Sequence, residues 1–160
     1  MKRSLLLALV LASVLTACSS AKKVDTVTSG CTPSGTGTTD LKTKPAYTVS
    51  SAKPPTETTV VDIVCGTGPT AATGSSVEVK YVGVDYATGK EFDSSWSRSP
   101  SDTLPFSIGA GVIAGFSKGT TGMQVGGRRE VVIPPKDGYG AGGPVPGGTL
   151  VFLIDLVKVG

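Results

Sequence analysis

The sequence has no histidine among its 160 residues, and this absence excludes several kinds of catalytic chemistry. Without histidine there is no Ser-His or Cys-His catalytic pair, and the commonest side-chain ligand for metals is missing. Charge is also scarce, because 17% of the residues are charged and no run of lysine and arginine exceeds two. Since nucleic-acid binding needs a basic patch, the sequence predicts no nucleic-acid partner.

Aromatic residues are few, at 6% of the chain, whereas the 22 glycines and 11 prolines are many. This composition is typical of a turn-rich β protein with a flexible stretch, and it argues against a helical bundle. The length suits one domain of ordinary size with additional segments. The formal charge of +3 includes Lys2 and Arg3, so without them 13 basic and 12 acidic residues remain, a net charge of +1.

The N-terminus has the organisation of a secretory leader. A short basic start at residues 1–3 precedes an apolar run at residues 5–12, which is far shorter than the roughly 20 residues that span a bilayer. The run ends in L-T-A-C at residues 15–18, which resembles the lipobox of a bacterial lipoprotein. The alternative is an ordinary secretory signal in which Cys18 happens to lie near the cleavage site.

Lipidation is the favoured reading, because a polar segment directly follows Cys18. It predicts a signal peptide at residues 1–17 and acyl chains on Cys18, which becomes the first residue of the mature protein. Two acyl chains suffice for stable anchoring. The expected location is therefore the cell membrane, with the protein lipid-anchored and facing the extracytoplasmic side.

Residues 18–56 are predicted to be a lipid-anchored flexible tether, because their glycine, threonine and serine cannot bury enough apolar surface to order the chain. Residues 46–49 form a possible short strand against the domain edge. Cys31 and Cys65 form an even pair in an oxidising compartment, so a disulfide between them is possible. It would close a loop of about 35 residues and contribute at most roughly 3–4 kcal/mol. The alternative is that both cysteines are free or serve separate purposes.

Residues 57–160 alternate between strand and turn signals at short intervals. Strands are expected near residues 60–64, 77–83, 91–95, 129–133 and 149–158, and one short helix at residues 113–119. Alternation places Val77, Val79 and Tyr81 on one face of their strand. Arg128 and Arg129 are interpreted as a solvated strand edge. The predicted class is α+β, with a curled antiparallel sheet of about five strands around one short helix. The inward face of the last strand is expected to consist of Leu150, Phe152, Ile154 and Leu156.

Several segments, in order, resemble FKBP-type peptidyl-prolyl cis-trans isomerases. They are V-K-Y-V-G at 79–83, G-K-E-F-D-S-S at 89–95, V-I-A-G-F at 112–116, G-M-Q-V-G-G-R-R at 122–129, I-P-P at 133–135, G-Y-G at 138–140 and T-L-V-F at 149–152. Each match alone is weak, and their common order over about residues 59–158 carries the resemblance.

The resemblance implies an isomerase domain that accelerates rotation about X–Pro bonds in an apolar pocket. The implied catalytic residues are Tyr81, Phe92, Asp93, Ile113, Tyr139 and Phe152. The implied substrate-binding residues are Leu104, Val112, Phe116 and Val145. The amide of Ile113 would hold a substrate carbonyl, the hydroxyl of Tyr139 would donate to the peptide, and Asp93 would lie at the polar rim.

No cofactor or metal is needed, because the barrier of about 18–20 kcal/mol comes from amide resonance. A water-poor pocket favours the twisted amide over the planar one. The implied partners are proline-containing unfolded or exported polypeptides, with macrolides of the rapamycin type also possible, and a small tethered domain is compatible with a monomer.

Purely structural roles are also possible for several of these residues. Phe92, Phe152 and Val112 are common core residues, and Asp93 before two serines is a common turn former. The chain also departs from the family pattern, with Phe116 where the family usually has Trp and a shorter loop at residues 140–148 in which only Val145 can overhang the pocket. The alternative function is a non-catalytic prolyl-peptide-binding or chaperone module on the same fold.

Overall fold

The computed structural model describes residues 31–99 and 101–160. The predicted signal peptide, Cys18 and the first part of the predicted tether lie outside the described residues. Within those residues, no helix is long and apolar enough to cross a membrane.

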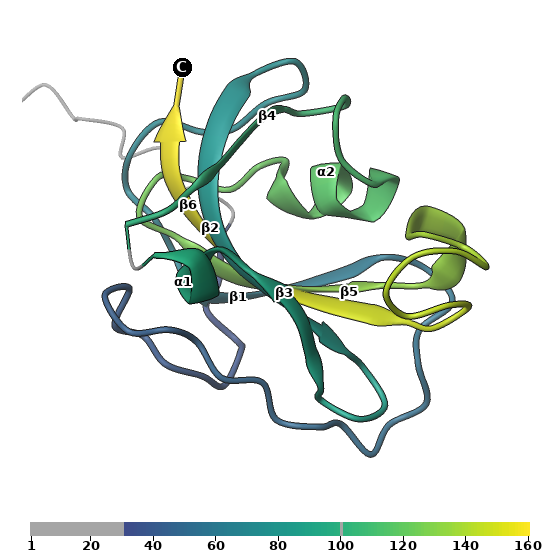
Figure 1. Cartoon of the computed structure of the whole chain (residues 1–160). Coiled ribbons are helices and arrows are strands. Elements are labelled where there is room, and N and C mark those ends of the chain that lie inside the picture. The colour runs from purple at the N-terminus through teal and green to yellow at the C-terminus, as the bar shows by residue number, and fades with distance from the viewer. Residues whose placement is uncertain (1–30, 100) are drawn as a thin grey trace, which may run out of the picture.

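One antiparallel sheet forms the frame of the domain and curls around a short helix (Figure 1). Its strands follow the order β1-β5-β6-β2-β3, and β4 pairs with β2 outside this path. The elements in chain order are β1 Thr59–Val64, β2 Ser76–Asp85, β3 Glu91–Ser94, α1 Ser95–Arg98, β4 Leu104–Ser107, α2 Ala114–Thr120, β5 Arg128–Ile133, η1 Pro135–Asp137 and β6 Leu150–Val159.

The sheet has six strands where about five were predicted, and β4 is the additional one. It has only four residues, and one of them is Pro105. Proline lacks a backbone donor, so within sheets it is confined to edges and strand ends. The pairing of β4 with β2 alone places Pro105 at an edge, where this deficit costs no ladder hydrogen bond.

The concave face of the sheet carries the core, and both predicted inward faces are confirmed. The core cluster includes Val77, Val79, Tyr81, Leu150, Phe152, Ile154 and Leu156. The helix α2 closes this core, within one residue of its predicted position. Its two glycines are poor helix formers, but a Cβ atom would lie 2.3 Å from Ile133 at Gly115 and 2.5 Å from Val131 at Gly119. The helix therefore contains glycine because it packs directly on β5.

The convex face is also buried, which the sequence interpretation did not anticipate. A second cluster contains Val82 and Val84 of β2 and Val151 and Leu153 of β6. Tyr47 and Trp96 pack against this cluster. The strand β6 is therefore covered on both faces, and its near-continuous apolar sequence reflects that position.

The segment that covers the convex face is part of the predicted flexible tether. We refer to residues 31–52 as the strap; in Figure 1 it runs, purple to blue, below the sheet. The predicted disulfide is present and joins Cys31 to Cys65 with a Cα–Cα distance of 5.9 Å. The amide of Gly35 donates to Asp62 O at 3.0 Å, and a Cβ atom at Gly35 would lie 2.7 Å from Ile63. This part of the tether is thus fixed on the domain, and its glycine permits a close approach to β1.

The possible strand at residues 46–49 does not form, because those residues pair with no strand. They are held by side chains instead. The hydroxyl of Tyr47 donates to Tyr86 O at 3.5 Å, and Lys44 forms an ion pair with Glu91 at 2.8 Å. The strap therefore packs on the sheet without extending it.

Arg128 is fully buried, so its interpretation as a solvated strand edge was wrong. Its Nε and Nη2 donate to the two carboxylate oxygens of Asp155 at 2.5 and 2.7 Å. The remaining three N–H groups donate to strap carbonyls, from Nη1 to Thr38 O at 2.6 Å and Asp40 O at 3.2 Å and from Nη2 to Thr43 O at 3.0 Å. One arginine therefore ties the strap to β5 and β6.

Arg129 is also buried, with 8% of its surface exposed. Its Nε donates to Asp62 on β1 at 2.6 Å, and its Nη1 donates to Gly119 O and Thr121 O at 2.9 and 3.1 Å. These carbonyls belong to the end of α2, where the last carbonyls have no partner within the helix. Neighbouring strand residues point to opposite faces, so the two arginines fix the strap on one side and α2 on the other.

Candidate active site

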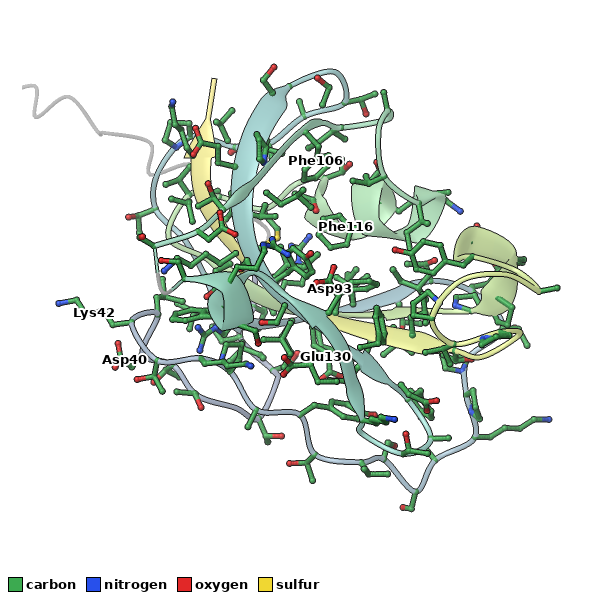
Figure 2. All side chains as sticks on the ribbon, in the orientation of Figure 1. Asp40, Lys42, Asp93, Phe106, Phe116 and Glu130 are labelled. Atoms are coloured by element: carbon green, nitrogen blue, oxygen red, sulfur yellow. A yellow bond between two sulfur atoms is a disulfide. The ribbon has the colours of Figure 1, made fainter. Side chains whose placement is uncertain are left out.

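A cavity of about 530 Å³ opens between α2, β4 and the strands β2, β3 and β6. Its lining comprises Tyr81, Asp93, Leu104, Gly111, Val112, Ile113, Phe116, Tyr139 and Phe152. Eight of these nine were singled out from the sequence, and Gly111 is the addition. In Figure 2, Phe106 lies beside α2, Phe116 lies below α2, and Asp93 lies below Phe116. Segments that are far apart in the sequence therefore meet at one concave site.

The floor of the cavity is a set of aromatic rings in edge-to-face contact around Phe116. Its ring centroid lies 5.9 Å from that of Tyr81 and 5.0 Å from that of Phe152, with interplanar angles of 87° and 89°. Such contacts stabilise aromatic pairs beyond their buried area. Phe116 and Phe152 are each 3% exposed, so the floor is apolar and fixed.

Two predicted pocket residues do not line the cavity. Phe92 packs behind the floor, with its ring 5.6 Å from that of Phe152. Val145 packs against the core cluster from the loop at residues 140–148. This loop is closed by a hydrogen bond from Gly147 N to Gly140 O at 2.7 Å, which turns the short loop back on itself. Both residues thus support the site from outside its lining.

Phe106 was missed by the sequence interpretation, although its ring lies 5.4 Å from that of Phe116. It belongs to β4, the strand that was not predicted. The alternation of Leu104 and Phe106 on either side of Pro105 was the available signal.

The polar rim of the cavity is centred on Asp93. The hydroxyl of Tyr81 donates to Asp93 Oδ2 at 2.5 Å, and Arg98 Nη1 donates to Asp93 Oδ1 at 3.3 Å. Arg98 Nε also donates to Asp102 at 2.5 Å. Burial raises the pKa of Tyr81, and the hydrogen bond to Asp93 raises that pKa further, while Arg98 opposes the shift. Arg98 was not predicted, since its approach depends on the single turn of α1.

The two serines after Asp93 explain why the F-D-S-S run has this form. The Oγ of Ser95 accepts from Tyr81 N at 3.0 Å, and the Oγ of Ser94 donates to Tyr81 O at 3.2 Å. Ser94 also caps α1 by accepting from Trp96 N at 3.1 Å. Asp93 accepts from Ser94 N at 2.8 Å, so it is a turn former and a rim residue at once. The serines thus lock the rim against β2.

Two potential donors at the cavity make no hydrogen bond to another described residue. One is the hydroxyl of Tyr139, which is 45% exposed at the rim. Burial and the negative charge of Asp93 both raise the pKa of Tyr139, so its hydroxyl stays protonated. The other is the amide of Ile113, which directly precedes α2, where the first amides of a helix have no partner within it. Both are available to a carbonyl bound in the cavity.

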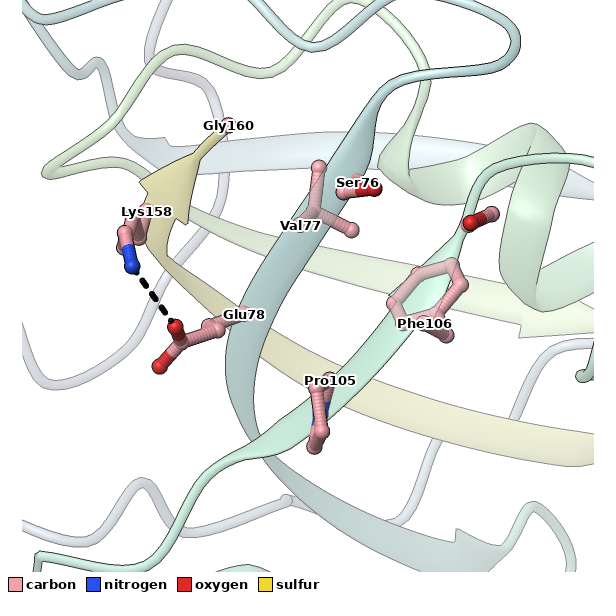
Figure 3. Close-up of a pocket in the computed structure, with 8 residues that line it drawn as sticks. Ser76, Val77, Glu78, Pro105, Phe106, Lys158 and Gly160 are labelled. Atoms are coloured by element: carbon pink, nitrogen blue, oxygen red, sulfur yellow. Dashed lines mark hydrogen bonds and ion pairs between the residues drawn. The ribbon is translucent and has the colours of Figure 1, made fainter.

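A second hollow, of about 300 Å³, lies on the other side of Phe106 between β2, β4 and the end of β6 (Figure 3). The exposed ion pair between Lys158 and Glu78, with its nitrogen and oxygen 3.1 Å apart, lies on the β6 side of the hollow. Its other lining residues include Ser76, Val77 and Pro105, and Phe106 is its only aromatic ring, so it has no floor of packed rings. The first cavity is therefore the better candidate for chemistry.

Comparison with known proteins matches the part of the chain that contains the first cavity. The family model described as FKBP-type peptidyl-prolyl cis-trans isomerase matches residues 68–157. A protein of Corynebacterium glutamicum named "Probable FK506-binding protein" is 46% identical over 118 residues, which cover 72% of this chain and 98% of the relative. The FK506-binding protein of Streptomyces anulatus is 47% identical over 122 residues, covering 72% of this chain and 97% of the relative.

Solved structures agree with the sequence relatives. FkpA from Escherichia coli superposes with a TM-score of 0.59 at 36% identity, covering 70% of this chain and 50% of that one. AtFKBP13 superposes with a TM-score of 0.57 at 34% identity, covering 64% of this chain and 93% of that one. The curled sheet and the helix α2 packed in it are thus similar to those of known FKBP structures.

Proposed function

The chain belongs to the family of FKBP-type peptidyl-prolyl cis-trans isomerases, and from this premise we propose that it accelerates X–Pro rotation in exported polypeptides and assists their folding at the cell envelope. The observation that carries the proposal is the cavity itself, in which an apolar floor around Phe116 meets the rim of Asp93, Tyr81 and Arg98. This site needs no metal, nucleophile or histidine, because X–Pro rotation breaks no covalent bond.

The proposed mechanism follows from the two states of the amide. The planar X–Pro amide is stabilised by resonance, which also separates charge. Twisting the bond removes the resonance and the charge separation. An apolar, water-poor cavity solvates the planar form less well than water does, so it lowers the barrier to the twisted form. Phe116, Phe152 and Tyr81 would hold the proline ring, while the amide of Ile113 and the hydroxyl of Tyr139 would bind peptide carbonyls.

Isomerisation of a proline-containing tetrapeptide by the full chain, purified in detergent and followed by NMR exchange without a protease, tests this proposal directly. We expect catalysis at micromolar enzyme that is inhibited by a rapamycin-like macrolide. If the protein suppresses aggregation of an unfolded client but produces no exchange, the non-catalytic chaperone alternative replaces the enzymatic one.

Macrolide binding is proposed because the two bacterial relatives are named for FK506 binding. The floor residue Phe116 provides an apolar ring but no indole N–H, so its contact area and hydrogen bonding are smaller than those of a tryptophan. We therefore propose weaker macrolide affinity than in family members with tryptophan there. Binding of the macrolide to the wild type and to Phe116→Trp tests this.

The catalytic rate is expected to be insensitive to pH from about pH 6 to about pH 9. The pKa values of Tyr81 and Tyr139 are both raised, so neither hydroxyl loses its proton in this range. The chain also has no histidine, the side chain that ordinarily titrates there. We predict that kcat/KM varies by less than about twofold across this interval. A bell-shaped profile with a midpoint inside it would contradict this prediction.

The lipid anchor on Cys18 remains a proposal that rests on the leader sequence, since Cys18 lies outside the described residues. The disulfide between Cys31 and Cys65 supports it, because disulfides persist in compartments outside the reducing cytoplasm. We expect Cys18→Ser to abolish labelling by radioactive palmitate and to move the protein from the membrane fraction to the soluble one. Cys31→Ser is the matched control and should leave the labelling intact.

A further inference from the structure

The side chain of Tyr139 reaches the cavity from a turn, and not from a strand or from α2. The residue is 45% exposed. The base of its side chain packs against Gly143, where a Cβ atom would lie 2.6 Å from the Cβ of Tyr139. The rings of the cavity floor, in contrast, are held by neighbouring rings. The position of the Tyr139 hydroxyl therefore depends on the backbone of the turn that carries it.

This turn is anchored by Asp137, the last residue of η1, which lies two positions before the tyrosine. A hydrogen bond from Gly140 N to Pro135 O at 3.1 Å closes the turn. Asp137 is buried, with 9% of its surface exposed. Each carboxylate oxygen accepts one hydrogen bond, Oδ1 from Lys118 Nζ at 2.8 Å and Oδ2 from Thr58 Oγ1 at 2.7 Å. The side chain of Asp137 thus holds the turn from within.

The two donors belong to different elements of the fold. Lys118 lies on α2, two residues after Phe116 of the cavity floor, and Thr58 directly precedes β1. The ammonium of Lys118, and then the hydroxyl of Thr58, lower the pKa of Asp137 from its ordinary value, so the carboxylate is ionised at neutral pH. One charged group therefore joins the turn of Tyr139 to the helix that carries the floor.

A contribution to folding alone is a weak explanation for this arrangement. The side chain of Lys118 is 57% exposed, and ion pairs with so exposed a partner contribute little to the free energy of folding. The end of α2 is already held to β1, because Arg129 binds both Asp62 and the helix carbonyls. The additional effect of the pair between Lys118 and Asp137 is to connect α2 with the turn.

We propose that Asp137 is a positioning residue that fixes the hydroxyl of Tyr139 relative to the apolar floor of the cavity. It acts through Lys118 and Thr58, which hold its carboxylate to α2 and to the start of β1. This inference rests on the proposed isomerase function and adds to it a residue that does not line the cavity. The hydroxyl can bind a peptide carbonyl in the planar and the twisted state alike, so its displacement should raise KM and preserve kcat.

The test measures isomerisation of a proline-containing tetrapeptide by the full chain, purified in detergent, with NMR exchange. Asp137→Asn should raise KM about three- to tenfold and change kcat less than about twofold. In a Tyr139→Phe background, the same replacement should change KM less than about twofold, because the hydroxyl that Asp137 positions is absent. Lys118→Met, at an exposed side chain, should also raise KM and serves in the same cycle if Asp137→Asn does not fold. Lys118→Arg keeps the charge and should stay within about twofold of the wild type.

Lys136→Met is the matched control. Lys136 directly precedes Asp137 on the same turn and forms an exposed ion pair with Glu57. Its replacement removes a charge from the turn but leaves both hydrogen bonds of Asp137 in place. We expect KM and kcat to remain within about twofold of the wild type.

Two results would overturn the proposal. One is an unchanged KM in both Asp137→Asn and Lys118→Met, and the other is a rise in KM that is equally large in the Tyr139→Phe background. A protein that isomerises no peptide at all refutes the proposed function instead. The ring signals of Tyr139 in protein labelled with carbon-13 tyrosine, assigned with Tyr139→Phe, then test the positioning alone. They should shift in Asp137→Asn and not in Lys136→Met, and an unshifted ring in Asp137→Asn refutes the role of Asp137.

Discussion

A fragment that begins at residue 57 is expected to be less stable than residues 31–160 by at least about 4 kcal/mol. The shorter fragment lacks the disulfide between Cys31 and Cys65, whose sequence separation is 34. In the chain-entropy model, closing a loop of this length contributes about 3–4 kcal/mol. The difference should be visible as a lower midpoint in urea or guanidinium unfolding of the two purified fragments.

Loss of the strap has further costs beyond the disulfide. Arg128 loses three carbonyl partners, and its ion pair with Asp155 becomes partly hydrated. The convex face, including Val82 and Leu153, loses the cover that Tyr47 provides. Apolar surface that returns to water costs about 25 cal/mol for each Å². We therefore expect the fragment from residue 57 to aggregate or to unfold at lower temperature, and to be a poor choice for activity assays.

A variant of the longer fragment separates these contributions. Cys31→Ser with Cys65→Ser removes the disulfide and leaves the strap in the chain, so it should lose only about 3–4 kcal/mol. If the fragment from residue 57 were within about 1 kcal/mol of residues 31–160, the strap would be a loosely attached tether as the sequence interpretation had it.

Replacing Asp93 by alanine is expected to lower kcat/KM about tenfold or more, which corresponds to about 1.4 kcal/mol of transition-state stabilisation. The carboxylate accepts the hydroxyl of Tyr81 and binds Arg98 at the rim of the cavity. Without it, the hydroxyl of the buried Tyr81 loses its acceptor, and the negative charge at the rim is lost. Asp93→Asn keeps an acceptor but removes the charge, so its rate should be intermediate.

The controls for this prediction lie in the same network. Asp102 binds Arg98 from the far side and does not line the cavity, so Asp102→Asn should change kcat/KM less than about threefold, as expected for an exposed ion pair. The side chain of Asp93 is 50% exposed, and its replacement should leave the unfolding midpoint nearly unchanged. Full activity of a folded Asp93→Ala protein would remove Asp93 from the catalytic machinery.

Much of this site could be predicted without coordinates, because each of its residues belongs to a local motif. Tyr81 belongs to an alternating strand, Asp93 precedes two serines that cap and anchor α1, and Ile113 directly precedes α2. The periodicity of β2 and β6 predicted which side chains point inward, and the structure confirms those faces. Such inferences succeed where backbone geometry alone fixes the direction of a side chain.

The failures share a different cause, which is that the partner lies far away in the sequence. Arg128 was assigned to solvent because a charged strand residue is usually exposed, yet it is buried by carbonyls 85 to 90 positions earlier in the chain. The strap was assigned to a flexible tether because its glycines and threonines lack hydrophobicity. Neither local composition nor periodicity reports a segment whose order comes from an arginine and a cysteine in the distant domain.

By itself, the sequence determined the class of fold, the inward faces of its strands and the residues from which an apolar prolyl pocket could be built. These properties depend on side-chain periodicity and on short motifs, which act over a few residues. Only the tertiary structure decided that the convex face is covered and that Arg98 completes the rim. Those features depend on how distant segments approach one another, and burial, ion pairing and cavity shape arise only from that approach.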